Sequence, residues 1–184
     1  MYELIILSLV ARGPVHGYII SSVINDVIGP YARASNGRIY PLLAKLEESG
    51  FIAVDKENES DGGRVSRSFA ITALGRKRFH DLMMETTTSP REYRDLFAFK
   101  VTAFDLITKE DRTSLLQHYV TFADAHVRHL ELQGKDLESA DSYGHSRVQR
   151  ERFGNVFAHL VATWKREKTW ATELLAAEPG RAKR

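Results

Sequence analysis

The chain has 184 residues, enough for one large domain or two small ones that each bury a core. It contains no cysteine, which excludes disulfides and thiolate chemistry and fits a reducing cytoplasm. The net charge is only +2, so binding to a polyanion would depend on where charges are placed rather than on their total. The longest apolar run, residues 4–11, is too short to span a bilayer, and we expect a cytoplasmic protein without a membrane partner.

Two short helices are expected before residue 30. Residues 2–11 are apolar nearly all round, so this helix should be covered on several sides, and a Gly-Pro pair stops it. A second helix should run from about residue 16 to residue 28, where another Gly-Pro pair ends it. Its apolar residues recur at helical spacing and predict its buried side: Ile19, Ile20, Val23, Ile24 and Val27.

The stretch 34–50 predicts a third helix. Ser35 or Asn36 can accept a hydrogen bond from the free amides of the first turn, as an N-cap does. Pro41 lacks an amide proton and should therefore lie within about the first turn. Gly50 can adopt the left-handed conformation that ends a helix.

This third helix has two distinct faces. One is an apolar stripe, Ile39, Leu42, Leu43 and Leu46, and the other is charged, with Arg38, Lys45, Glu47 and Glu48. The positive charge lies toward the beginning of the helix, where free amides and the helix dipole also favour a phosphate. Such a helix suits a DNA groove, and an ordinary amphipathic surface helix is the alternative.

The pattern changes to strands after this helix. Residues 51–56 alternate enough for a short strand, and residues 65–71 predict a second one, with turn residues between them. Three helices followed by a two-stranded β-hairpin are the winged-helix pattern. Thr72 should cap a fourth helix that ends before residue 86, so we place the end of the first domain, 1–88, there. The expected buried side of the fourth helix is Leu74, Phe79, Leu82 and Met83.

Residues 89–178 carry only helix signals and form the second predicted domain. One helix opens it, a second spans 109–132, and a polar loop at 134–145 precedes a long final helix. The seam of a coiled coil is predicted along the final helix: Phe153, Phe157, Leu160, Trp164, Ala171 and Leu174. The partner of this seam is the 109–132 helix of the same chain, that of a second copy, or both. Residues 179–184 are predicted to be a disordered basic tail.

Three segments in a fixed order carry a resemblance to a known family. The order HGY (16–18), SNGRIYPLLAKLEESGFI (35–52) and FAITALGR (69–76) resembles the PadR family of bacterial transcription regulators. The most specific parts are the Tyr40-Pro41 pair and the leucine-glutamate-x-x-glycine run after it. The C-terminal half, which begins PREYRDLFAFK, is similar to the long helical domain of the family's virulence-activator and phenolic-acid-repressor branch.

The resemblance implies a fold and an activity. We expect a mainly α protein with an N-terminal winged helix-turn-helix, including its two-stranded hairpin, and a C-terminal antiparallel coiled-coil domain for dimerisation. The resemblance further implies a homodimer, held by the C-terminal helices with help from the first helix, that binds inverted-repeat operators in double-stranded DNA. We expect a repressor whose repression is relieved by a small aromatic ligand.

Three side chains of the third helix are the main candidates for DNA contacts. Arg38 can pair with a guanine through two hydrogen bonds, and a phosphate contact is the equal alternative. Tyr40 should donate its hydroxyl to a phosphate or else pack against the wing. Lys45 lies nearly two turns further on and should meet the DNA backbone rather than a base.

Other candidate contacts lie before and after these positions. Ser35 and Asn36 could serve as both cap and phosphate ligand, although capping alone explains them. For Tyr18 a position in the core is the stronger interpretation, and a phosphate contact comes mainly from its place in the family pattern. Arg64 and Arg67 on the second strand are expected to touch phosphates.

Two departures from the family pattern affect sequence recognition. Asn36-Gly37-Arg38 stands where the family often has Ser-Gly-Thr or Ser-Gly-Ser, so the family's DNA preference does not carry over. The predicted wing tip is acidic, and from Arg33 to Arg76 the charge balance is only +1. We therefore expect that the tip does not insert deeply into a minor groove. The acids concerned are Glu57, Glu59 and Asp61.

Two tryptophans are candidates for a ligand site. Trp164 and Trp170 could line a flat aromatic pocket of the kind that binds planar phenolics in relatives, but a place in the seam or core is the favoured interpretation. We predict no cofactor and no metal. His118, His126 and His129 share a helix, yet neither a cysteine nor a suitably spaced carboxylate completes a ligand set.

Two function classes compete, and a third is weak. The first is a dimeric DNA-binding regulator. The second is a protein-interaction module that uses the winged helix and the helical arm without DNA, which the acidic wing and near-neutral charge favour. An enzyme is not expected, because a glycine-rich phosphate loop, a catalytic triad and paired catalytic carboxylates are all missing from the sequence.

Overall fold

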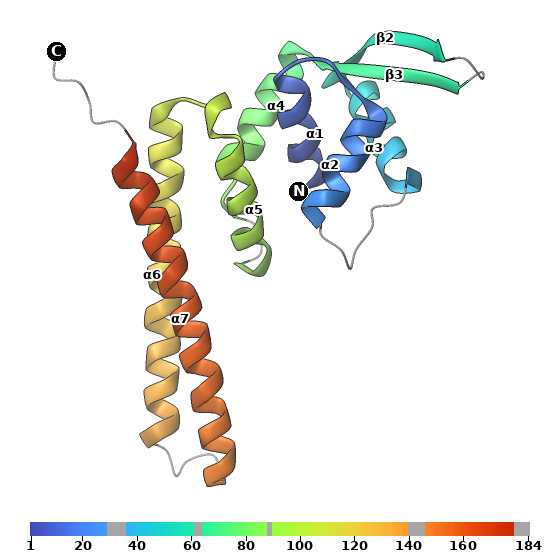
Figure 1. Ribbon diagram of the computed structural model, residues 1–184. Helices are drawn as coiled ribbons and strands as arrows, with labels where there is room; N and C mark the ends of the chain where they lie inside the picture. Colours follow the sequence, from blue (N-terminus) through green and yellow to red (C-terminus); the bar gives the residue numbers. More distant parts are fainter. Residues whose placement is uncertain (29–35, 61–63, 88–89, 140–145, 179–184) are drawn as a thin grey trace, which may run out of the picture. The chain divides into compact units, whose positions relative to one another are not determined.

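The computed structural model shown in Figure 1 describes residues 1–28, 36–60, 64–87, 90–139 and 146–178. The predicted tail at 179–184 lies outside these residues. The chain divides into two compact units, Met1–Ile107 and Thr108–Arg184, which we describe separately.

Four helices and a small sheet build the winged helix of the first unit. Helix α1 provides the centre of its core, because five of its apolar side chains are at most 2% exposed: Leu4, Ile5, Ile6, Leu7 and Val10. Helix α2 buries only one side. Ile20 and Ile24 are fully buried, whereas Ile19 and Val27, which we expected inside, are 38% and 42% exposed. The helices are α1 (Tyr2–Ala11), α2 (Gly17–Ile28), α3 (Asn36–Glu48) and α4 (Ala73–Met84).

The sheet of this unit is antiparallel with strand order β1-β3-β2. Its strands are β1 (Val15–His16), β2 (Ile52–Ser60) and β3 (Arg64–Ile71). The hairpin is longer than expected, because strand pairing continues through polar residues that show no apolar alternation. The two-residue strand β1 was not predicted, since a segment this short leaves no pattern in the sequence.

Helix α3 ends as the sequence predicts. Gly50 has φ +72°, and its amide donates to the carbonyl of Glu47 at 2.9 Å. The amide of Phe51 donates to the carbonyl of Leu46, also at 2.9 Å, which completes a Schellman motif. This turn carries the chain directly from α3 into the hairpin.

Helix α4 begins at the predicted cap. The hydroxyl of Thr72 accepts a hydrogen bond from the amide of Gly75 at 3.0 Å and donates one to the carbonyl of Gly50 at 2.6 Å. Phe79 and Met83 are buried as expected. Leu74 is 53% exposed and corrects our prediction, because the glycine next to it, rather than the leucine, faces the interior.

The first unit extends past our expected boundary at residue 88. It includes α5 (Pro90–Thr102) and a short 3-10 helix, η1 (Phe104–Leu106), because Tyr93 and Phe97 are fully buried. Lys100 is also fully buried, and its ammonium group donates to the carbonyl oxygen of Glu85. Burial lowers the pKa of Lys100 to about 8.

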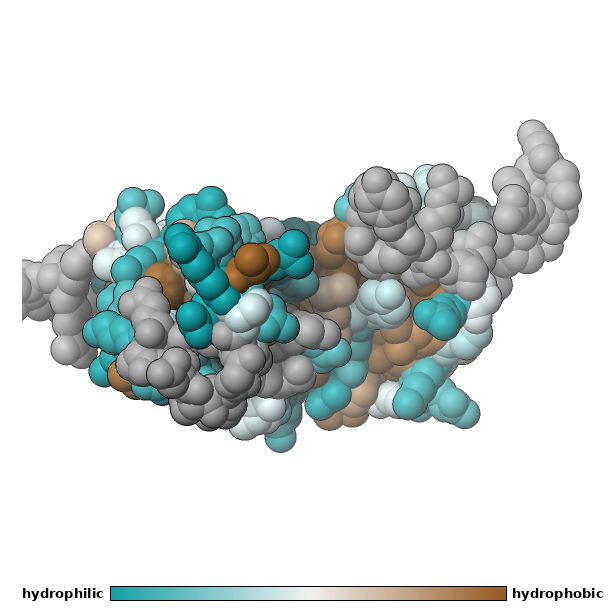
Figure 2. All heavy atoms as spheres, turned by 90° about the horizontal axis from the view of Figure 1, so that it is seen from below, coloured by the Kyte–Doolittle hydropathy of each residue, from teal (hydrophilic) through white to brown (hydrophobic). Residues whose placement is uncertain are grey.

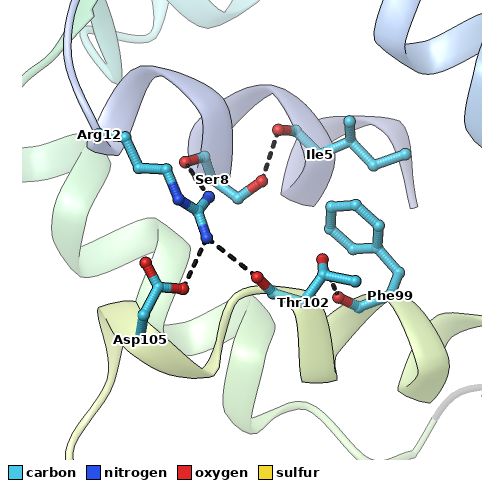
Figure 3. Close-up of polar contacts among 6 residues, drawn as sticks. All are labelled: Ile5, Ser8, Arg12, Phe99, Thr102 and Asp105. Carbon is cyan, nitrogen blue, oxygen red and sulfur yellow. Dashed lines mark hydrogen bonds and ion pairs between the residues drawn. The ribbon is translucent and has the colours of Figure 1, made fainter.

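Arg12, just after α1, ties this helix to α5 and η1 (Figure 3). Its Nη2 donates to the carbonyl of Thr102 at 3.0 Å and to Oδ1 of Asp105 at 2.6 Å. Its Nη1 donates to the carbonyl of Ser8 at 2.9 Å, which satisfies a carbonyl at the end of α1. One guanidinium group therefore joins segments about ninety residues apart in the sequence.

The second unit is an antiparallel pair of long helices, α6 (Lys109–Ser139) and α7 (Arg147–Ala177), as Figure 1 shows. Helix α6 continues past residue 132, through part of the segment that we expected to be a loop. Packing explains this extension, because Gly134 lies close to Phe157 of α7. None of the described helices is both long and apolar enough to cross a membrane.

Ion pairs join α6 and α7 at intervals along their length. Nε of Arg112 lies 2.9 Å from Oε1 of Glu178, and this pair holds the pKa of Glu178 below its usual value. Further along, Nζ of Lys168 lies 2.6 Å from Asp124, and Nζ of Lys165 lies 2.7 Å from Glu131. The three pairs connect residues far apart in the sequence and therefore fix the register of the two helices.

Candidate nucleic-acid interface

Helix α3 is anchored on one side and exposed on the other. Ile39, Leu43 and Leu46 are at most 3% exposed and hold the helix on the core. Arg38 and Lys45 are exposed on its outer side. A fixed helix that presents cations outward can make contacts with a polyanion without rearranging its backbone.

The beginning of α3 differs in one respect from our expectation. Pro41 is the sixth residue of the helix, beyond the first turn, where its missing amide would cost less. The burial of the apolar stripe on both sides of Pro41 explains why the helix tolerates it. The expected caps are not observed, because Ser35 and the side chain of Asn36 lie outside the described residues.

Two tyrosines flank the first turn of α2. Tyr18 is 62% exposed, which corrects the core position that we favoured, and its ring stacks on His16 with centroids 5.6 Å apart. Tyr40 of α3 is 46% exposed. A Cβ added at Gly17 would lie 3.4 Å from a ring carbon of Tyr40, so the glycine allows this ring to lie against α2. Both phenol side chains are therefore available at the surface where α2 meets α3.

Strand β3 contributes two polar side chains to the same region. Nη2 of Arg67 forms an ion pair with Oε1 of Glu47 at 2.8 Å, and its guanidinium carbon lies 5.5 Å from the centroid of Phe69. The hydroxyl of Ser66 is 3.2 Å from Nδ1 of His16. The side chain of Arg64 and those of the acidic wing tip lie outside the described residues.

His16 and Glu47 were not among our candidates. Each becomes relevant only through a residue on another element: His16 contacts Ser66, and Glu47 contacts Arg67. Spacing within one segment carries no signal of such a pairing. The alternation of Arg67 and Phe69 on one face of β3 was the only hint in the sequence.

The candidate ligand residues Trp164 and Trp170 lie on α7 and pack against α6. The ring of Trp164 stacks on His126 at 4.2 Å and meets Phe122 edge-on at 5.5 Å. Trp170 meets Tyr119 edge-on at 6.4 Å. Tyr119 in turn stacks on Phe122 at 6.0 Å, so the two indoles belong to one continuous cluster of aromatic rings along the pair of helices. In the described part of the chain, no group of three or more potential metal ligands occurs.

These features define the class of protein. A helix presented beside α2 and followed by an antiparallel hairpin is a winged helix-turn-helix, the fold of many DNA-binding proteins. Residues 6–81 match the family model "Transcriptional regulator PadR-like family". Residues 6–81 of the N-terminal unit are therefore similar to a family of transcriptional regulators.

Known proteins resemble the chain over nearly its whole length. The negative transcriptional regulator PadR of Bacillus subtilis (strain 168) is 26% identical over 178 residues, which cover 93% of each chain. The crystal structure of Bacillus subtilis PadR with operator DNA is 21% identical, with 95% of this chain and 96% of that chain covered and a TM-score of 0.43. Its structure with p-coumaric acid is 22% identical, with 95% and 93% covered and a TM-score of 0.39.

Proposed function

We propose that the protein is a cytoplasmic repressor that binds inverted-repeat operators as a homodimer. The observation that carries the proposal is the outward presentation of Arg38, Tyr40 and Lys45 on a helix whose other side is buried. Repression is the direction of regulation in the Bacillus subtilis relative, a negative regulator.

Each candidate has a separate role in this proposal. Arg38 reads a guanine edge from the first turn of α3, since its guanidinium can form two hydrogen bonds there. Tyr18, Tyr40 and Lys45 bind phosphates and fix the position of α3 in the groove. The same role falls to Ser35, Asn36 and Arg64. The sequence also suggested it for Arg67, but the guanidinium of Arg67 is paired with the carboxylate of Glu47. The acidic wing tip stays outside the minor groove.

An exposed apolar stripe on α7 supports the homodimer. Phe153, Val156 and Leu160 are 42%, 54% and 36% exposed although they recur at the spacing of a helical seam. Figure 2, which views the end where α6 stops and α7 starts, shows hydrophobic side chains among hydrophilic ones. A second copy would cover this stripe. The first helix could assist only through its exposed start near Met1, because its other apolar residues are mostly buried in its own unit.

Alanine at Arg38 should weaken binding to the operator by about 1 to 3 kcal/mol and relax the preference at one base pair. The reason is the loss of a bidentate contact to a base edge. Operators can be selected from genomic fragments, and the affinities of wild type and R38A can be compared on the operator, on single-base variants and on random DNA. An equal loss on operator and random DNA would refute base reading and leave a phosphate contact.

A small aromatic effector is part of the proposal, with Trp164 and Trp170 as its candidate contacts. Both indoles are partly exposed and lie in the same aromatic cluster. A planar phenolic acid such as p-coumaric acid should quench tryptophan fluorescence and release operator DNA over the same concentration range. Because the chain has only two tryptophans, W164F and W170F would assign the quenching. A flat titration would argue against an aromatic effector.

A protein-interaction module remains the second candidate function. The near-neutral net charge and the acidic wing residues favour it. Salt dependence separates the two functions, because a protein that neutralises several phosphates loses affinity steeply as salt rises. Failure to bind duplex DNA even at low salt would support the interaction module.

A further inference from the structure

An ion pair fixes the wing strand to the end of helix α3. Glu47 lies in the last turn of α3, and Arg67 lies near the middle of β3. Nη2 of Arg67 donates to Oε1 of Glu47 at 2.8 Å, and the two side chains are 40% and 32% exposed. The guanidinium also lies near the ring of Phe69, two residues along the strand. Arg67 is therefore held in place on two sides while part of it remains accessible to solvent.

The pair borders the surface that we propose faces DNA. Tyr40, Ala44 and Glu47 occur at steps of four and three residues, so they follow one edge of α3. Tyr40 and Ala44 are exposed along this edge. A phosphate that approached this edge would meet Glu47 and Arg67 together and would compete with the carboxylate for the guanidinium.

We propose that Glu47 holds Arg67 back from DNA phosphates and thereby limits binding to DNA of any sequence. The proposal rests on the proposed DNA-binding function. A carboxylate and a phosphate are alternative bidentate partners of a guanidinium, so a retained Arg67 neutralises no phosphate and releases no counterion. Lower sequence-independent affinity leaves more of the protein for its operators, because non-specific sites vastly outnumber specific ones.

The test compares E47Q with E48Q on a duplex of random sequence. Both variants of the full chain remove one negative charge from neighbouring positions of α3, but only E47Q removes the carboxylate that pairs with Arg67. For E47Q the plot of log affinity against log salt should become steeper by about 0.9, the contribution of one additional phosphate contact. The ratio of the DNA affinity of E47Q to that of E48Q should then be about three- to fourfold larger at 50 mM than at 200 mM salt. The slope for E48Q should equal that of the wild type.

Two further variants identify the residue responsible. R67Q alone should leave the slope on random DNA unchanged, because Glu47 already holds Arg67 in the wild type. The double variant E47Q/R67Q should show the same salt dependence as the wild type, because the arginine that steepens the slope of E47Q is missing. Melting curves without DNA would show that each variant is folded.

Different outcomes separate this inference from the proposed function. If the wild type binds random DNA but E47Q and E48Q have equal slopes, the inference is wrong and the DNA-binding function stands. A slope for R67Q alone that is shallower than the wild-type slope by about 0.9 would also overturn the inference, since Arg67 would then already contact a phosphate in the wild type. If the wild type binds no DNA, both the function and the inference fail.

Discussion

Replacing Gly75 with alanine should destabilise the N-terminal unit by on the order of 3 kcal/mol or more. A Cβ at this position would lie 1.9 Å from the carbonyl oxygen of Phe51 and 2.8 Å from its carbonyl carbon. The obstacle is backbone, which cannot rotate away as a side chain can. The same carbonyl accepts the amide of Thr72 at 3.1 Å, so a shift of either segment would disturb the link between the end of α3 and the start of α4.

Thermal or urea unfolding followed by circular dichroism would measure this loss. Tryptophan fluorescence would not, because both tryptophans lie in the C-terminal unit. Gly154 of α7 is the matched control, since a Cβ there would meet nothing within 4 Å. G154A should therefore be neutral or stabilise the helix by up to about 1 kcal/mol. Equal stability of G75A and wild type would contradict the close approach of α4 to Phe51.

The stability of the N-terminal unit should rise by on the order of 2 kcal/mol between about pH 8 and pH 10. Burial lowers the pKa of Lys100 to about 8 in the folded state, against an ordinary value of 10.5 for a lysine. In this window the unfolded chain holds a proton on Lys100 that the folded chain has released, so increasing pH favours folding. Above pH 10 the trend should reverse, because burial raises the pKa of Tyr93 and the unfolded chain then loses its phenolic proton first.

K100M provides the control for this prediction. Methionine keeps an apolar stem in the buried position but cannot titrate, so its free energy of unfolding should be flat between about pH 8 and pH 10. Denaturant unfolding of both proteins at several pH values would measure the difference. The same rise in K100M would show that another group is responsible.

The sequence predicted the winged helix because its elements carry local signals. Gly50 and Thr72 mark the end of α3 and the start of α4 through hydrogen bonds within a few residues, and both were assigned correctly. The limits of the hairpin and of α6 were less accurate. Polar pairing in β2 and β3, and packing of α6 on α7, extended these elements where the local pattern had already ended.

The candidate site was only partly predictable. The exposure of Arg38, Tyr40 and Lys45 followed from the opposite apolar stripe of α3. The exposure of Tyr18 did not, because an aromatic residue at the start of an apolar helix resembles a core residue until its neighbours are known. Glu47 was placed on a charged face, and its specific partner could not be inferred from that face.

What the sequence determined by itself was the presence of the helices, the end of α3, the start of α4 and the buried stripe of α3, since these depend on spacing and caps within a single segment. Only the tertiary structure decided which charges lie in contact. Arg12 with Asp105, Arg67 with Glu47 and Arg112 with Glu178 join residues 93, 20 and 66 positions apart. Such contacts depend on how separate segments pack, and the periodicity of one segment contains no information about another.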